Sequence, residues 1–493
     1  MTRSRPTFPV FSPRPDGVML GVIACLVGIA ATTVLPSGIV RPLMGEEPVA
    51  ATGSSDSLGG YLSTWKIDRD GRRLLEEPGA WDEARQALAL RVMTRLVLAP
   101  PKLAVRWNED AVPVAGPGQP AEDAGRLIGN AMIRATGRAV FVAPQVLPPA
   151  QAEISGRPQI DVVRIVTPAG LVLDVLTDAA PRSWPRWKAI DESAAVVGLP
   201  LAAGSGPRPG PPPADGVEWP AQSAGLLLAA TRVSWFPPTP LGGLGLDYGL
   251  FDTVVDGQRL VAGDTEAFYG MLAAVGRGTE EGIEAAAGPP RDVVPLIDPR
   301  TGWFGQHRGE PLTVDGIARR ATRIEVDDPV RRRQIGTDHY WELFVFVETS
   351  LIKINDQLQE SYPIVCCVRT LPDGMPTGQS ITERVRVSGF AMKRYGYPLP
   401  KLRGADEKQG ADGKKVEERR ETPLLIGKQA VWLPAPSPAS AASLLGWVFT
   451  GLAGIIGLLL AVGVWSFSRA ARRKKRLDRE TLPDRLQLPG AGD

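Results

Sequence analysis

The chain has 493 residues with 56 basic and 54 acidic side chains, so it is close to charge balance, and 43% of its residues are hydrophobic. Its only cysteines are Cys25 and the adjacent pair Cys366 and Cys367, which excludes a fold held together by disulfides. Stability must therefore come from burial of apolar surface, and a chain of this length is ample for several hydrophobic cores.

Two apolar, uncharged runs stand near the ends of the chain, at 17–40 and within 434–468. Each is long enough to cross a hydrocarbon core of about 30 Å as a helix. The first run has 24 residues and lacks an A-x-A-like cleavage site, so we interpret it as an uncleaved anchor rather than as a signal peptide. The sequence thus predicts two transmembrane helices that flank a large central region.

The charges beside the two runs predict their orientation, because segments rich in Lys and Arg resist translocation. The head before residue 17 has three basic residues and one acidic residue, and the tail from Arg469 has eight basic and four acidic residues. Both termini are therefore expected in the cytoplasm of a bacterium, with the central region outside the inner (cell) membrane. That region keeps 45 basic and 49 acidic residues, a net charge of −4, which predicts no binding to nucleic acid. The cluster Arg472–Arg476 is interpreted as a stop-transfer signal, with anionic lipid or a cytoplasmic partner as the alternative.

Composition and patterning divide the chain into eight parts. These are a cytoplasmic head (1–16), transmembrane helix 1 (17–40), a helical entry region (41–121), a first β-barrel-like unit (122–240), a linker with a helix at 264–275 (241–293), a second β-barrel-like unit (294–436), a stalk with transmembrane helix 2 (437–468) and a basic cytoplasmic tail (469–493). The Pro/Gly-rich segment 200–223 and the polar segment 403–421 are predicted to be solvated loops, and 278–293 a turn-prone link.

Two helices are predicted from apolar spacing and end signals, at Trp81–Leu98 and Asp264–Val275. Pro100 and Pro101 stop the first, and Asp264 is the expected cap of the second. Most other segments alternate or are rich in Val, Ile and Thr, which is typical of strands. One of them, Tyr362–Arg369, holds the two adjacent cysteines, so one thiol should face the core and the other should face outward.

The segments Ile133–Pro237 and Arg319–Pro434 carry similar landmarks in the same order, which predicts an internal duplication. The landmarks are Arg134–Thr136 against Arg320–Thr322, Glu192 and Gly198 against Glu383 and Gly389, and Trp235 against Trp432. Each copy then has about five strands on about 100 residues, a size at which small barrels of the oligonucleotide/oligosaccharide-binding (OB) type avoid open sheet edges. The two glycines are expected where a strand bends, and the two tryptophans are expected to plug a barrel rather than to bind a ligand.

Candidate reactive groups are few. His307 and His339 are the only histidines, and with one adjacent cysteine pair they lack the ligand spacing of a structural zinc site. Asp338 precedes His339, but neighbours in a strand point to opposite faces, so the two are not expected to meet. The run Leu241–Gly249 lacks a full phosphate-binding fingerprint and is interpreted as a tight connection. The cluster Arg331–Arg333 is interpreted as a solvated loop, with binding to an acidic partner or to lipid headgroups as the alternative.

Two resemblances accompany these residues. The runs Gly243–Val254 (GLGLDYGLFDTV) and Thr337–Thr349 (TDHYWELFVFVET) are similar to parts of a large bacterial family of doubly membrane-anchored proteins with no assigned activity. The layout of an outer β-rich domain between a first and a last membrane helix resembles the surfeit-locus family of cytochrome-oxidase assembly factors. Neither resemblance implies a site residue.

The sequence therefore predicts a membrane-anchored, mainly β α+β protein in which two transmembrane helices flank a duplicated, OB-like exterior. The expected function is a non-enzymatic binding or assembly module, whose partners are the lipid bilayer and a membrane-proximal protein. The alternative is a hydrolase or redox enzyme with a pocket between the two β units, where His339, Glu342 and the pair Cys366 and Cys367 would be the reactive groups. No catalytic, cofactor-binding or metal-binding residue and no cofactor is assigned.

Overall fold

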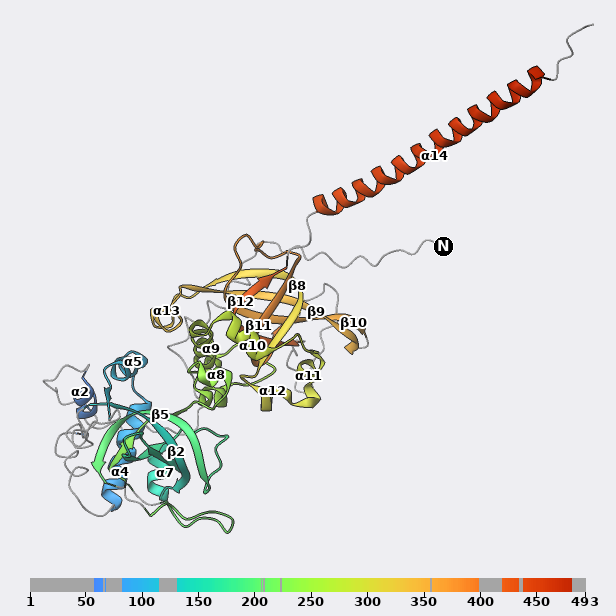
Figure 1. Cartoon of the computed structure of the whole chain (residues 1–493). Coiled ribbons are helices and arrows are strands. Elements are labelled where there is room, and N and C mark those ends of the chain that lie inside the picture. The colour runs from blue at the N-terminus through green and yellow to red at the C-terminus, as the bar shows by residue number, and fades with distance from the viewer. Residues whose placement is uncertain are drawn as a thin grey trace, which may run out of the picture. The chain divides into compact units, whose positions relative to one another are not determined.

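The computed structural model describes residues 57–64, 67, 82–114, 131–204, 206, 209–221, 224–354, 357–398, 419–433 and 438–480. The chain divides into two compact units, Met1–Trp432 and Leu433–Asp493, and Figure 1 shows the elements of both. The predicted first span at 17–40, and all of the predicted loop 403–421 except its last three residues, lie outside the described residues.

The first sheet contains seven strands in the order β1-β2-β3-β4-β6-β5-β7. An additional pairing of β2 with β5 joins the five strands β2, β3, β4, β6 and β5 into a closed ring of pairings, in which only β4 and β6 run parallel. The strands are β1 (Val112–Pro113), β2 (Ile133–Val146), β3 (Gln159–Val166), β4 (Val172–Thr177), β5 (Ala189–Ala203), β6 (Leu226–Ala229) and β7 (Val233–Trp235).

The second sheet is a closed barrel of five strands in the order β10-β12-β11-β8-β9. Here β10 and β12 are the parallel pair, and the other neighbours are antiparallel. The strands are β8 (Pro311–Glu325), β9 (His339–Ile354), β10 (Gln357–Thr370), β11 (Glu383–Pro398) and β12 (Arg419–Trp432). The predicted mainly β architecture with a small barrel is therefore confirmed.

Two glycines allow strands to approach closely in the two sheets. A Cβ added at Gly198 in β5 would lie 2.8 Å from the Ala229 carbonyl oxygen, and one added at Gly389 in β11 would lie 2.7 Å from that of Ile426. Cβ atoms are not found at such distances from backbone atoms, so both positions need a residue without a side chain.

Helices cover one face of the first sheet. They are α2 (Leu58–Ser63), α4 (Glu83–Val97), α5 (Pro101–Glu109) and α7 (Pro149–Ser155). α4 confirms the predicted helix at 81–98, and the Asp82 carboxylate caps it by accepting the Arg85 backbone N–H at 2.9 Å. The two prolines do end α4, but α5 starts at the second of them, because proline fits the first turn of a helix.

The helices of the second half are mostly short. They are α8 (Pro240–Gly243), α9 (Thr265–Arg277), α10 (Glu280–Ala287), α11 (Val294–Ile297), α12 (Trp303–His307) and α13 (Pro329–Ile335), with 3₁₀ turns η1 (Tyr248–Thr253), η2 (Ala262–Asp264) and η3 (Pro299–Thr301). α9 confirms the predicted helix at 264–275. The segment 278–293 holds α10, whose start is capped by the Thr279 hydroxyl.

The prediction of a solvated loop at Arg331–Arg333 is wrong, because these residues lie in α13. The Arg331 guanidinium donates to Glu266 at 3.0 Å and lies over the Tyr269 ring at 5.4 Å. The Arg332 guanidinium donates to the Val326 carbonyl. A carboxylate and an aromatic face thus hold Arg331 against the protein and a backbone carbonyl binds Arg332, while Arg332 and Arg333 remain exposed to solvent.

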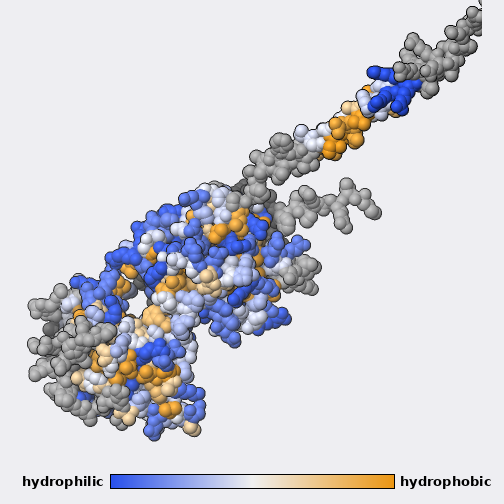
Figure 2. Space-filling view, in the orientation of Figure 1, coloured by the Kyte–Doolittle hydropathy of each residue, from blue (hydrophilic) through white to orange (hydrophobic). Residues whose placement is uncertain are grey.

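The second unit is dominated by α14 (Pro438–Glu480), a helix of 43 residues. Its segment Phe449–Arg469 has a mean hydropathy of 1.9 and none of it is buried, so it is long and apolar enough to cross a membrane. In Figure 2 an apolar stretch of this helix is followed by a hydrophilic one. The described part of the chain therefore contains one candidate span, at the place predicted for the second transmembrane helix.

Candidate functional site

A cavity of about 50 Å³ lies between α9 and the outer face of the second barrel. Its polar lining comes from α9, from the 3₁₀ turn before it and from three strands of the barrel: Asp264, Thr265, Tyr269, Tyr340, Glu342, Cys367 and Tyr395. Apolar side chains, among them Val261, Phe268, Val365 and Leu424, complete the walls. The cavity is thus an apolar space into which several groups capable of hydrogen bonding project.

Each of the two carboxylates at the cavity is paired with a cation. Glu342 accepts from the Arg320 guanidinium at 2.6 Å, and that guanidinium lies 3.8 Å from the centre of the Phe344 ring. Asp264 Oδ2 accepts from Lys393 Nζ at 2.6 Å, and both of these side chains are fully buried. Burial lowers the pKa of the Lys393 ammonium, while the Asp264 carboxylate opposes that change.

Asp264 precedes α9, as predicted, but its carboxylate does not cap the helix. Its Oδ2 atom accepts the Val261 backbone N–H at 3.0 Å in addition to Lys393. Its Oδ1 atom is buried and has no hydrogen-bond partner among the described residues. A buried acceptor without a donor is costly, so this atom marks a place that a donor would fill.

The thiol and the phenols at the cavity are held in their protonated forms. Burial, followed by the nearby Glu342 charge, raises the pKa of Cys367 well above its ordinary value. Burial raises the pKa of Tyr395 to about 12 and that of Tyr340 well above 10. At neutral pH these groups are therefore hydrogen-bond donors and not nucleophiles.

The two adjacent cysteines face opposite sides of β10, as predicted. Cys366 packs inside the barrel with residues such as Leu343 and Leu425, and Cys367 packs on the outer face with α9 residues such as Phe268. Both are free thiols, and they are 0% and 2% exposed. Cys366 is buried by the barrel interior, and Cys367 is buried because α9 covers the outer face of the strand. Burial raises the pKa of Cys366 far above its ordinary value, so both thiols are protonated at neutral pH.

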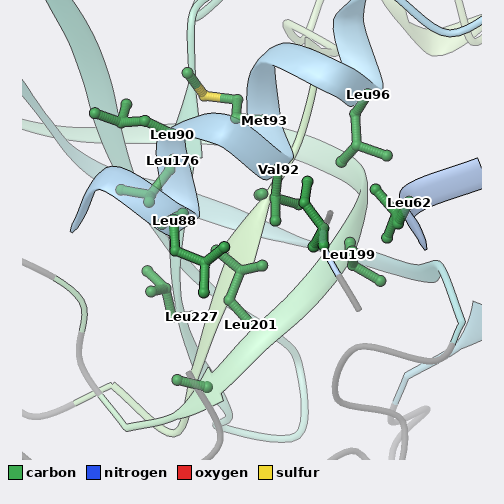
Figure 3. Packing of buried hydrophobic residues seen from close by; sticks show 14 of the residues in the cluster. Leu62, Leu88, Leu90, Val92, Met93, Leu96, Leu176, Leu199, Leu201 and Leu227 are labelled. Atoms are coloured by element: carbon green, nitrogen blue, oxygen red, sulfur yellow. The ribbon is translucent and has the colours of Figure 1, made fainter. Parts of the chain in front are cut away.

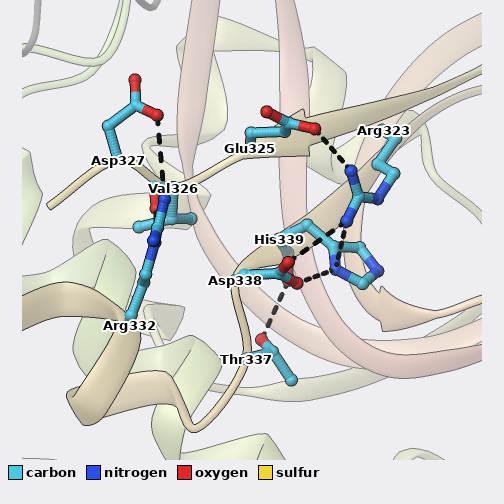
Figure 4. A network of polar contacts seen from close by, with 8 residues as sticks. All are labelled: Arg323, Glu325, Val326, Asp327, Arg332, Thr337, Asp338 and His339. Carbon is cyan, nitrogen blue, oxygen red and sulfur yellow. Dashed lines mark hydrogen bonds and ion pairs between the residues drawn. The ribbon is translucent and has the colours of Figure 1, made fainter. Parts of the chain in front are cut away.

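His339 lies at the start of β9 within a surface network of charged groups (Figure 4). Its Nδ1 atom is 2.6 Å from Asp338 Oδ1 and 3.2 Å from the Arg323 guanidinium. The expectation that Asp338 and His339 would not meet is wrong, because Asp338 precedes the first residue of the strand and the alternation of strand side chains does not apply to it. The close Asp338 carboxylate belongs to a solvated ion network that also includes Glu325.

The structure brings together only two of the four reactive residues of the enzyme alternative. Glu342 and Cys367 are directly opposite each other in the β9–β10 pairing and both line the cavity. Cys366 points into the barrel interior, and His339 belongs to the surface network.

The other histidine, His307, stacks on Trp303 with 4.8 Å between the ring centres, and its Nδ1 atom lies 2.7 Å from the Glu310 carboxylate. In the described ranges, no three His, Cys, Asp or Glu side chains form a group that could hold a metal ion.

Sequence reasoning missed the buried pair of Lys393 and Asp264 and the tyrosines at the cavity. The available signal was Lys393 itself, a charged residue that directly follows the apolar strand segment Gly389–Met392. A lysine at such a position requires a carboxylate or a carbonyl from elsewhere, but the pattern does not say which.

Comparisons with known proteins do not identify the chain. No protein-family model matches it, and no curated protein matches it significantly. Among solved structures, a deletion mutant of the single-stranded DNA binding protein from Thermus aquaticus aligns with 62% of this chain and 95% of its own length, at 7% identity and a TM-score of 0.13. At that TM-score the similarity supports no inference about fold or function.

Proposed function

We propose that the chain is a membrane-anchored, non-enzymatic binding or assembly module that presents two related OB-like barrels to a membrane-proximal protein partner. The observation that carries this proposal is the state of the candidate reactive groups. The thiols are buried and protonated, Glu342 is neutralised by Arg320, and His339 is tied into a surface ion network. Groups that are protonated or held in ion pairs favour a binding role over a catalytic one.

The pairing order supports an OB-like fold for both sheets. If the five strands of each ring are numbered in chain order, their order around the ring is first, second, third, fifth, fourth in both cases. The third and fifth strands are parallel in both rings. A closed or nearly closed five-stranded barrel is the arrangement of the OB type.

Matching registers support the duplication. Ala139 opposite Ile165 is followed by a bulge before Phe141, and Ala318 opposite Val345 is followed by one before Arg320. A Cβ added at Gly137 would lie 2.3 Å from the Val166 carbonyl oxygen, and one at Gly316 would lie 2.4 Å from that of Phe346.

The repeat extends beyond the segments expected from the sequence. α7 and α13 each join the first and second strands of a ring, each has seven residues, begins with proline and ends at a left-handed glycine. Helices α4 and α5 precede the first ring as α9 and α10 precede the second. We therefore place the two copies at about 83–235 and 265–432.

The predicted equivalence of Arg134–Thr136 and Arg320–Thr322 is wrong, because Arg134 pairs with β5 whereas Arg320 pairs with β9.

The absence of nucleic-acid binding is supported by the helices. The outer face of the second and third strands is the binding face of OB barrels. In the first ring α4 residues pack on that face against Val162 and Leu176, and in the second α9 residues pack against Tyr340 and Cys367. The chain's own helices thus occupy the usual nucleic-acid surface, and the central region carries a net negative charge.

Anchoring is proposed through α14 together with the predicted span at 17–40. The apolar segment Phe449–Arg469 and the basic residues that follow it fit an inner-membrane protein with a cytoplasmic C-terminus and an exported central region. With an anchor at each end, the β units would stay close to the bilayer.

The test is chemical crosslinking in intact membranes, followed by purification of the full chain. The proposal expects a stoichiometric protein partner, recovered equally by the wild type and by a variant with alanine at His339, Glu342, Cys366 and Cys367. The assembly function is excluded if no such partner is recovered. It is also excluded if the four-alanine variant, folded in the membrane, fails to support the cellular phenotype that the wild type supports.

A further inference from the structure

The interface between helix and barrel differs in chemistry between the two halves of the chain. By strand register, Val162 opposite Leu176 in the first ring occupies the place of Glu342 opposite Cys367 in the second. In the first ring α4 fills this interface with apolar side chains such as Leu88 and Leu90 (Figure 3). The same place thus holds a packed apolar pair in one half and a polar pair in the other.

The second interface departs from ordinary packing in three ways. Polar groups replace apolar ones, a cavity of about 50 Å³ remains beside them, and Asp264 Oδ1 has no hydrogen-bond partner among the described residues. Each of these features costs stability. A protein whose first half packs the equivalent surface with leucine and valine gains nothing structurally from this change, which is the pattern expected of a binding site.

The charges around the cavity select a neutral ligand. Three carboxylates are matched by three cations: Asp264 with Lys393, Glu342 with Arg320, and Glu266 with Arg331. A cationic ligand would be repelled by Lys393 and Arg320, and an anion would be repelled by the carboxylates. What the site offers instead is a free acceptor at Asp264, the phenol groups of Tyr340 and Tyr395, and apolar walls.

We propose that the cavity beneath α9 binds a small neutral molecule that carries hydroxyl groups on a short apolar frame. A cavity of about 150 Å³ holds benzene, and a single water needs about 10–15 Å³. The cavity beneath α9, at about 50 Å³, lies between these two volumes and therefore suits a frame of about two to four carbons. Its hydroxyl group donates to Asp264 Oδ1 and accepts from a phenol, while its carbons contact Val261, Val365 and Leu424.

The experiment uses the full chain in detergent micelles, with ¹³C-labelled Leu and Val methyl groups observed by NMR. Propan-2-ol is the probe, and 2-chloropropane, which has a similar shape but no donor, is its control. The methyl groups of Val261, Val365 and Leu424 should shift and saturate with propan-2-ol, at about millimolar concentration for a ligand of this size. Half-saturation by 2-chloropropane should need at least about tenfold more, because the control lacks the hydrogen bond to the charged Asp264 carboxylate.

Two variants test the site itself. The double variant Glu342→Val, Cys367→Leu copies the first ring into the second and should abolish the saturable shifts. Val261→Phe fills the cavity from its rim and should also abolish the saturable shifts. It provides the test if the double variant does not fold. Methyl groups of Leu88 and Leu176 in the first ring should not respond in any protein.

The proposal is overturned if the cavity methyl groups do not saturate, if both probes act equally, or if either folded variant responds like the wild type. This inference goes beyond the proposed assembly function and fails separately from it. Recovery of the crosslinked partner by the double variant would leave the assembly function standing even if no small molecule binds.

Discussion

The indole N–H of Trp235 donates a 2.8 Å hydrogen bond to the Glu192 carboxylate, and the indole N–H of Trp432 donates one of the same length to Glu383. In each case the tryptophan ends the last strand of its sheet and pairs with the strand that carries the glutamate. Both rings are half-buried against the hydrophobic cluster of their own sheet. The tryptophans therefore hold β7 against β5 in the first sheet and β12 against β11 in the second.

The two tryptophans should contribute similarly to stability. Trp235→Phe and Trp432→Phe each remove the hydrogen bond to a charged acceptor and some apolar contact, so each is expected to lower the free energy of unfolding by about 1–3 kcal/mol. Urea unfolding followed by fluorescence of the remaining tryptophans measures the change. A large loss at one position with none at the other would show that the two contacts are not equivalent.

The buried pair of Lys393 and Asp264 should be more costly to break than to replace. Lys393→Met leaves an unpaired buried carboxylate, which costs about 3–5 kcal/mol, whereas the double variant Lys393→Met, Asp264→Leu should recover much of that loss. Thermal unfolding of the single and double variants gives the comparison. As a control, Arg300→Ala removes the pair of Arg300 with Asp298, whose arginine is exposed, and should change little. Equal destabilisation by the single and double variants would contradict the pairing.

Glu280 should make stability decrease as the pH rises. Burial, followed by the charge of Glu284, raises the pKa of Glu280 from 4.5 to about 6. The folded state therefore binds more protons than the unfolded state between about pH 4.5 and 6, so its contribution is present below that window and is lost as the pH rises through it. Since Glu280 is partly exposed, solvent screening limits the loss to about 1 kcal/mol.

The measurement is the free energy of unfolding of wild type and Glu280→Gln across pH 4 to 7. Glu280→Gln should remove the decrease, and Glu281→Gln, its exposed neighbour in α10, should keep it. An unchanged profile in Glu280→Gln would assign the pH dependence to other groups.

Gly137 and Gly316 should not tolerate alanine. An added Cβ would lie 2.3 or 2.4 Å from a carbonyl oxygen of the neighbouring strand, so the strands must separate. Each substitution is expected to cost at least about 2 kcal/mol, whereas Gly305→Ala, where a Cβ meets open space, should be close to neutral. Soluble yield and melting temperature report the difference, and a normal melting temperature for Gly316→Ala would argue against the close pairing of β8 with β9.

A charge within α14 should weaken membrane association. Leu459 lies near the centre of the segment Phe449–Arg469, and an arginine there costs about 2.5–3.5 kcal/mol of insertion free energy. Leu459→Arg should therefore increase the fraction of protein extracted by alkaline carbonate, and Leu459→Ala should not. The effect should be clearest in a variant that also lacks residues 1–40.

Local patterns in the sequence determined much of the secondary structure. Apolar spacing and end signals located α4 and α9, because a helix satisfies its hydrogen bonds within one segment. The long uncharged run located the apolar part of α14, and the period of two in β10 placed Cys366 and Cys367 on opposite faces. Composition was a poorer guide where short helices are rich in small or charged residues, as in α10 and α13.

The site was decided by tertiary structure. The pairing of Lys393 with Asp264 joins residues 129 positions apart, and the register that sets Glu342 opposite Cys367 depends on how β9 and β10 pair. The sequence pattern predicts that a residue is buried or exposed but not which residue it meets, since contacts between distant segments depend on closure of the whole barrel. Cys367 illustrates this limit: the alternation placed the two adjacent cysteines on opposite faces of the strand, and only the packing of α9 made the face of Cys367 a cavity wall.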